Sequence, residues 1–170
     1  MTLPLGGRIG GVSPQFRPFI SGQIELGGIL TGTQIRTPDS EVSVEHLSPG
    51  DLVITRNGGS VPLLAIEWDT VFEQAVEFTP GAMGQDAPDS GLILPASQPI
   101  LLRDWRAKVM FGQPQAVAPA GLLVDHGIIL DRGEQELSLH RLIFDRDHVV
   151  YAGGLELASE PIRDRLRHVA

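Results

Sequence analysis

Apolar and polar residues alternate with a period of two in short runs along most of the chain. Such alternation, together with enrichment in β-branched residues, is typical of strands with one buried face. Glycine and proline interrupt the runs at close intervals, so long helices have no room. The pattern therefore predicts an all-β domain. The runs that we interpret as strands are residues 34–36, 41–45, 51–55, 61–68, 71–78, 92–94, 100–102, 128–130, 137–144 and 148–152.

Turn and helix signals set the order of these strands. The Arg-Asn-Gly-Gly stretch at 56–59 predicts a tight hairpin, with Asn57 at a position of positive φ. Proline in second place at 37–40 and at 48–51 predicts two further turns. A short helix is expected at 104–111. We divide the chain into an N-terminal extension at 1–25, a domain at 26–160 and a C-terminal helical tail at 161–170.

The amino-acid composition excludes several classes of function. The chain has no cysteine, which excludes disulfides, thiolate catalysis and cysteine-ligated metals. Its formal net charge is −8, and no cluster of Lys and Arg stands out, so we expect no nucleic acid as a partner. No apolar run approaches the roughly 18 residues of a membrane span, and we expect no membrane contact. With no signal-peptide pattern, the cytoplasm is the default location, and export without an N-terminal signal stays open.

Several segments in a fixed order carry a family resemblance. They are TGTQIRTP at 31–38, VEHLSPGDLVIT at 44–55, GAMG at 81–84, LPASQPILL at 94–102, RDWR at 103–106, FG at 111–112, PA at 119–120 and LHRLIFDRDHVVYAGG at 139–154. Together they resemble a Hint domain of the Hedgehog/intein superfamily, in its bacterial branch. The resemblance implies a flattened horseshoe of short strands with pseudo-twofold symmetry, in which the two ends of the module lie close together. This fold agrees with the all-β pattern.

The resemblance also implies an acyl-shift reaction, and this chain departs from its pattern. In the family, the first residue of the module is a Cys or Ser nucleophile, an inner-strand His polarises the scissile amide, and inteins end in a His-Asn pair. Here the first position falls on Gly28, which has no nucleophile, and the histidine falls on Gln98, which cannot deliver a proton. The only asparagine is Asn57, in the hairpin turn. We therefore predict a catalytically degenerate domain that acts as a binding or structural module.

Two alternative hypotheses assign a chemical reaction to this domain. A shifted alignment nominates Thr31 or Thr33 as the oxygen nucleophile of an N-to-O acyl shift, assisted by Gln98, Asp145 or His148; both hydroxyls are weak nucleophiles without a positioned base. The second alternative is a hydrolase built on the dense stretch that holds His140, Asp145, Asp147 and His148. It requires these side chains to converge, whereas turn carboxylates beside exposed histidines would have the same spacing.

The remaining candidates have ordinary structural explanations. Asp125 and His126 lie in a loop without a serine at an interpretable spacing. Trp68 and Trp105 are expected to anchor the core. No zinc spacing and no phosphate-binding glycine motif is present, so no metal or cofactor is expected. The extension and the tail are the expected places for a protein partner or for self-association.

Overall fold

The computed structural model describes residues 27–84 and 86–161, which form two antiparallel sheets and confirm the all-β prediction. The first sheet has the order β1-β10-β6-β7, with β13 pairing parallel to β10. Its strands are β1 (Ile29–Leu30), β6 (Ala65–Phe78), β7 (Leu92–Pro95), β10 (Ile129–Phe144) and β13 (Glu160–Pro161). Because β10 pairs with both β1 and β13, it brings the start and the end of the described domain onto one strand.

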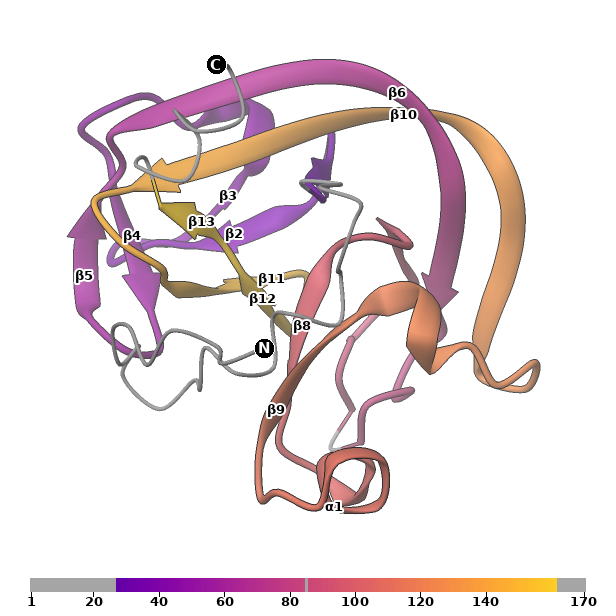
Figure 1. Cartoon of the computed structure of the whole chain (residues 1–170). Helices are drawn as coiled ribbons and strands as arrows, with labels where there is room; N and C mark the ends of the chain where they lie inside the picture. Colours follow the sequence, from indigo (N-terminus) through magenta and orange to yellow (C-terminus); the bar gives the residue numbers. More distant parts are fainter. Residues whose placement is uncertain (1–26, 85, 162–170) are drawn as a thin grey trace, which may run out of the picture.

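The second sheet has eight strands in the order β3-β2-β11-β12-β8-β9, with β4 pairing to β11 and β5 to β4. Figure 1 shows its strands gathered beneath the long arch of β6 and β10. Its strands are β2 (Gln34–Arg36), β3 (Glu41–Ser43), β4 (Leu52–Thr55), β5 (Gly59–Pro62), β8 (Pro99–Leu102), β9 (Ala116–Pro119), β11 (Val149–Ala152) and β12 (Leu155–Ala158).

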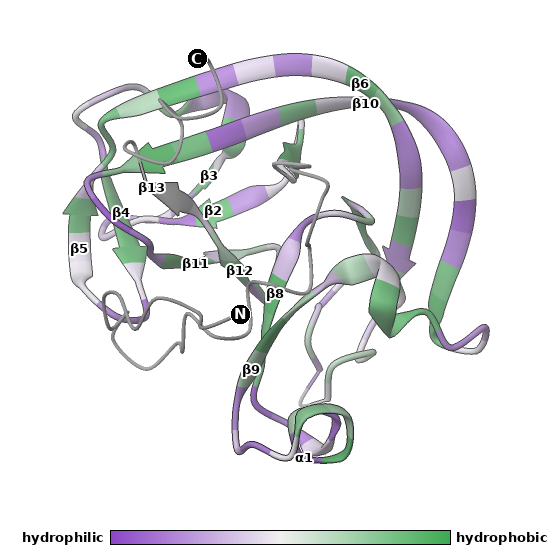
Figure 2. Cartoon of the chain, viewed as in Figure 1, coloured by the Kyte–Doolittle hydropathy of each residue, from purple (hydrophilic) through white to green (hydrophobic). Residues whose placement is uncertain are grey.

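The arch is one continuous ribbon, although the sequence predicts two separate strands for each of its arms. β6 and β10 pair from Ile143↔Ala65 to Ile129↔Phe78, with a bulge between Asp131 and Glu134. Residues 131–136 of β10 are exposed, so their polar character reflects solvent on both faces and does not mark a break in the strand. In Figure 2 the curved middle of the arch is correspondingly hydrophilic.

The core lies between the sheets, and both tryptophans are outside it. Phe78, Phe144, Leu94 and Ile129 are among its fully buried side chains. Trp68 is 67% exposed and Trp105 is 64% exposed, so the prediction that they anchor the core is wrong. In a chain with few aromatic residues, leucine, isoleucine and valine fill the interior instead.

The short elements follow from local chemistry. Helix α1 (Trp105–Phe111) starts where the Asp104 carboxylate accepts from the N–H of Arg106, and it ends at Gly112, whose φ is 68°. Two 3-10 turns, η2 (Val44–His46) and η3 (Ala120–Leu123), complete the described elements. Strand β13 occupies Glu160–Pro161, where a helix N-terminus was expected; residues 1–26 and 162–170, with the predicted extension and most of the tail, lie outside the described residues. None of the described helices is long and apolar enough to cross a membrane.

The 56–59 hairpin forms as predicted, but for a different local reason. The residue with positive φ is Gly59, at 67°, and Asn57 is not among the positive-φ residues of the described chain. The Asn57 side chain instead reaches the turn between β10 and β11. There its Oδ1 accepts from the N–H of Val149 at 3.1 Å, and its Nδ2 donates to the carbonyl of Asp147 at 3.0 Å. Asn57 therefore ties the β4–β5 hairpin to the start of β11.

Candidate functional site

The peptide bond between Gly27 and Gly28 lies at the start of β1 and is held at both of its polar atoms. The carbonyl oxygen of Gly27 accepts a hydrogen bond from Nε of Arg141 at 3.1 Å. The N–H of Gly28 donates to Oε1 of Gln98 at 2.9 Å. This is the bond that the family resemblance aligns with the scissile amide. A guanidinium on a carbonyl oxygen is the kind of donor that stabilises a developing oxyanion.

The backbone at Gly28 leaves no room for a nucleophilic side chain. Its φ is +145°, and a Cβ added there would lie 2.8 Å from the Cβ of Leu139 on β10. Gly27 is equally restricted: its φ is +67°, and a Cβ would lie 2.7 Å from Oε1 of Gln98. The doublet is therefore required by the close packing of the segment before β1 on β10 and Gln98. Gly28 therefore carries no nucleophilic side chain, and Leu139 fills the space that a Cβ at this position would need.

Gln98 acts as a cross-link between chain segments. It is 3% exposed, in the turn between β7 and β8. Its Nε2 donates to the carbonyls of Pro99 at 2.8 Å and of Ala158 at 2.9 Å, while its Oε1 accepts from Gly28. The carboxamide thus joins the start of β1 to the end of β12. Toward the Gly28 nitrogen Gln98 is an acceptor, so it cannot protonate that nitrogen as a leaving group.

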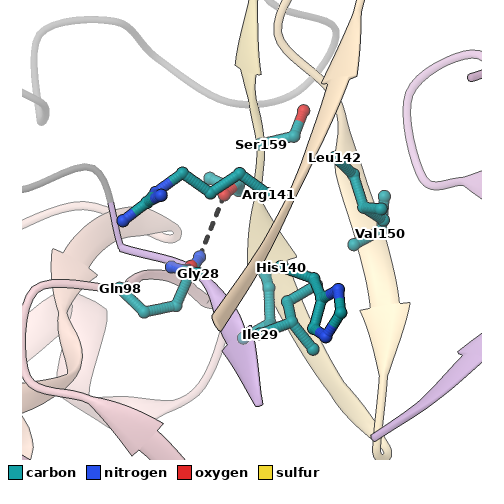
Figure 3. A pocket seen from close by; sticks show the side chains of 10 residues that line it. Gly28, Ile29, Gln98, His140, Arg141, Leu142, Val150 and Ser159 are labelled. Carbon is teal, nitrogen blue, oxygen red and sulfur yellow. Dashed lines mark hydrogen bonds between the residues drawn. The ribbon is translucent and has the colours of Figure 1, made fainter. Parts of the chain in front are cut away.

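The cavity at this site has a volume of only about 30 Å³. Figure 3 shows Gly28, Gln98, His140 and Arg141 around it, with residues of β11 and β12 on the far wall. A cavity of this size holds one or two water molecules and no larger substrate.

Thr31, one of the predicted oxygen nucleophiles, does meet a histidine. Its Oγ1 lies 2.9 Å from Nε2 of His140 and donates to Oγ of Ser138 at 3.2 Å. The same Ser138 oxygen accepts from Nε1 of Trp68 at 2.7 Å. Burial lowers the pKa of His140, and the nearby Glu45 carboxylate partly opposes this shift. The hydroxyl has one proton, so His140 acts as a general base only where its Nε2 is unprotonated and the hydroxyl turns from Ser138 toward the ring.

Thr33, the other predicted nucleophile, does not share this arrangement. It is 7% exposed, its N–H donates to the carbonyl of Leu30 at 3.1 Å, and its own carbonyl accepts from Val44. The side chain is buried behind the turn that it closes. The structure therefore places a histidine ring nitrogen beside the Thr31 hydroxyl and shows no such contact for Thr33 among the described residues.

The predicted cluster in 140–148 separates into two pairs. His140 faces Thr31, whereas Nε2 of His148 lies 3.3 Å from Oδ1 of Asp145 and its Nδ1 lies 3.3 Å from Oδ1 of Asn57. His148 is 1% exposed, and burial lowers its pKa while Asp145 acts in the opposite direction. Within 27–84 and 86–161 no three His, Asp or Glu side chains are placed to share a metal ion. Neither histidine joins the other in one catalytic group.

Two contributions were not anticipated from the sequence. The first is the role of Arg141. A cation inside the apolar run Leu-His-Arg-Leu-Ile-Phe is a signal that it has a buried partner. The pairing of His140 with Thr31 joins residues 109 positions apart, which no local pattern reveals. Asp125, by contrast, behaves as a loop residue: its Oδ1 accepts from the N–H groups of Gly127, Ile128 and Ile129.

The two sheets, with the first and last described strands both paired to β10, form an intein-like β-fold. A family model described as "Hint domain" matches residues 28–162, so the chain belongs to the Hint-domain family. Among the curated proteins, none matches.

Solved structures agree on the fold. A bacterial intein-like domain from Clostridium thermocellum is 14% identical, covers 78% of this chain and 98% of its own, and has a TM-score of 0.53. A DnaB intein from Synechocystis is 12% identical, with 79% and 99% covered and a TM-score of 0.53. The gp41-1 intein is 15% identical, with 77% and 97% covered and a TM-score of 0.51. At these identities the similarity concerns the fold alone.

Proposed function

We propose that this Hint domain does not cleave or splice its chain and that it serves as a binding or structural module. The observation that carries the proposal is the closed site at Gly28. The nucleophile position has no side chain, a Cβ there would collide with Leu139, and the residue at the histidine position accepts a hydrogen bond where an acid would donate one.

The contacts of the Gly27–Gly28 peptide bond support a structural role for the positions that align with the family's reacting residues. Arg141 and Gln98 hold the bond from β10 and from the β7–β8 turn, and Gln98 continues to β12. These contacts join elements of both sheets. Large apolar side chains left exposed, including Trp68, Phe72, Trp105 and Val109, offer contact area for a protein partner or for another copy of the chain.

The Thr31–His140 contact supports a second candidate, an N-to-O acyl shift at the Leu30–Thr31 bond. Oγ1 of Thr31 would attack the carbonyl carbon of Leu30, the C–N bond would break, and His140 would carry the hydroxyl proton to the freed nitrogen. Hydrolysis of the resulting ester would give fragments 1–30 and 31–170. Against this candidate, the N–H of Thr31 donates to the carbonyl of Ser138 at 3.2 Å, so the leaving nitrogen is engaged in backbone pairing.

Intact-mass spectrometry separates the two candidates. The full chain, carrying a folded tag at each end, is incubated for days with and without hydroxylamine, which cleaves esters. The proposal expects one unchanged mass without hydroxylamine and no fragment beginning at Gly28 or Thr31 with it; a cut at Asn57–Gly58 is the reagent's own reaction with an Asn–Gly bond. A cut before Thr31 that disappears in Thr31→Ala and in His140→Gln would establish the second candidate, and a cut before Gly28 would contradict the closed-site argument. Thr37→Ala, at a hydroxyl in the β2–β3 turn, is the matched control.

A further inference from the structure

A second hollow, on the opposite side of strands β11 and β12, has a volume of about 500 Å³. The two strands alternate their side chains: Val150 and Leu157 face the small cavity near Gly28, whereas Tyr151 and Glu156 face this groove. Arg36 of β2 also lines it, as do Met83, Gly84 and Ala87. Its volume falls in the range of small-molecule sites, about 300–1,000 Å³.

The groove presents two polar groups that the domain itself does not use. The guanidinium carbon of Arg36 lies 4.9 Å from the centre of the Tyr151 ring. Glu41 is opposite Arg36 in the β2–β3 ladder, yet no ion pair joins Arg36 to any described carboxylate. No hydrogen bond of the Tyr151 hydroxyl is found within the described part of the chain either. The guanidinium lies over the face of the ring, and both it and the hydroxyl can donate hydrogen bonds.

The two carboxylates of the groove are already neutralised. Glu156 accepts from Nε and Nη2 of Arg103 at 2.8 and 2.7 Å, and Arg56 lies 3.4 Å from it. Asp104 is paired with Arg106 and begins α1. Arg36 is therefore the charged group of the lining that has no ion pair with a described carboxylate. A guanidinium that is stacked on an aromatic ring presents its N–H groups edge-on, as two-point binding of a carboxylate requires.

The remaining lining is apolar. Met83 supplies it with a partly exposed side chain, and the buried Ile100, Leu101 and Leu155 form the floor, with Gly84 and Ala87 beside them. An inorganic anion would leave this surface uncovered, so the ligand needs an apolar body as well as a negative group.

We propose that this groove binds a small organic carboxylate with a flat apolar body. The carboxylate accepts from Arg36 and from the Tyr151 hydroxyl, and the apolar body lies along Ile100, Leu155 and Met83. This site is separate from the one at Gly28, and the inference holds whether or not the chain cleaves itself.

The test is a titration of the full chain with naphthoate, followed by backbone amide NMR and calorimetry. Saturable shifts are expected at groove residues such as Leu155 and Gly84. The neutral isostere naphthamide lacks the negative charge, and the anion acetate lacks the apolar body. Each is therefore expected to bind at least about tenfold more weakly than naphthoate. The absence of saturable shifts, or equal binding of naphthoate and naphthamide, would overturn the proposal.

Variants assign the contacts. Arg36→Gln is expected to weaken naphthoate binding about tenfold or more, and Tyr151→Phe a few-fold, because only a hydroxyl is lost. Arg146→Gln removes the same charge from the exposed β10–β11 turn, outside the groove, and is expected to leave affinity unchanged. Unchanged affinity in Arg36→Gln, with the fold verified by circular dichroism, would refute the assignment.

Discussion

At the scale of single residues, the Gln98 carboxamide pairs with three backbone groups from different parts of the fold. A carboxamide offers one acceptor oxygen and a two-proton donor nitrogen, and here each is matched by a backbone partner. A neutral imidazole in the same place has one donor and one acceptor, so it would leave one of the three partners unpaired. A glutamine at this position therefore completes a buried hydrogen-bond set.

Gln98→Ala is expected to destabilise the domain by about 2–4 kcal/mol, because it leaves buried backbone groups unpaired and opens a cavity. Urea unfolding followed by fluorescence measures the change. The control Gln113→Ala removes the same side chain at an exposed position and is expected to change stability by less than about 0.5 kcal/mol. Equal effects of the two variants would show that the Gln98 cross-link contributes nothing to stability.

The buried His148 predicts a pH dependence of stability. Burial lowers its pKa from the ordinary 6.5, so the folded state favours the neutral ring and the unfolded state binds more protons. Its contribution is complete above pH 6.5 and is lost as the pH falls toward the lowered folded-state pKa. His140 acts in the same direction.

We expect the unfolding free energy to decrease from about pH 7 to about pH 5 and His148→Gln to flatten this slope. The variant is also expected to be less stable overall, because the ring packs edge-on against Phe144. His46→Gln, at an exposed position, should leave the slope unchanged. A steeper slope in His148→Gln would contradict the assignment. Chemical denaturation across this pH range provides the measurement.

At the scale of elements, the sequence predicted strands where burial imposes alternation and failed where it does not. Strands β2, β4 and β11 agree with the predicted runs to within about one residue, because one face of each meets the core. The arms of the β6–β10 arch were split, because a ribbon exposed on both faces has no apolar period to read. Strand β9, Ala-Val-Ala-Pro, and β12, Leu-Glu-Leu-Ala, were missed because alanine and leucine carry little β preference.

The candidate site divides in the same way. The empty nucleophile position and the glutamine could be located from the sequence, because both depend on residue identity within a matched segment. The role of Arg141, the contact of Thr31 with His140 and the groove beside Tyr151 depend on long-range pairing of β10 with β1 and of β11 with β2. Such pairings are set by the tertiary fold, and a single sequence has no local signal for them.

At the scale of the whole molecule, exposed apolar side chains and net charge oppose each other. Trp68 and Phe72 are four residues apart on β6, so they lie on the same face of the arch, and they are 67% and 72% exposed. A second exposed pair, Trp105 and Val109, lies on α1 at the other end of the view in Figure 1. Contact through either pair would remove apolar surface from water, while two copies of net charge −8 repel each other.

This balance predicts self-association through the arch that strengthens with salt. Raising the ionic strength from about 0.01 to about 1 M shortens the Debye length roughly tenfold, which removes the repulsion and leaves apolar contact intact. Sedimentation velocity should therefore show more dimer at high salt. Phe72→Ser should abolish the increase, whereas Val109→Ser should retain it. Loss in Val109→Ser alone would move the interface to α1, and a monomer under every condition would contradict self-association and leave the exposed aromatics to a different protein partner.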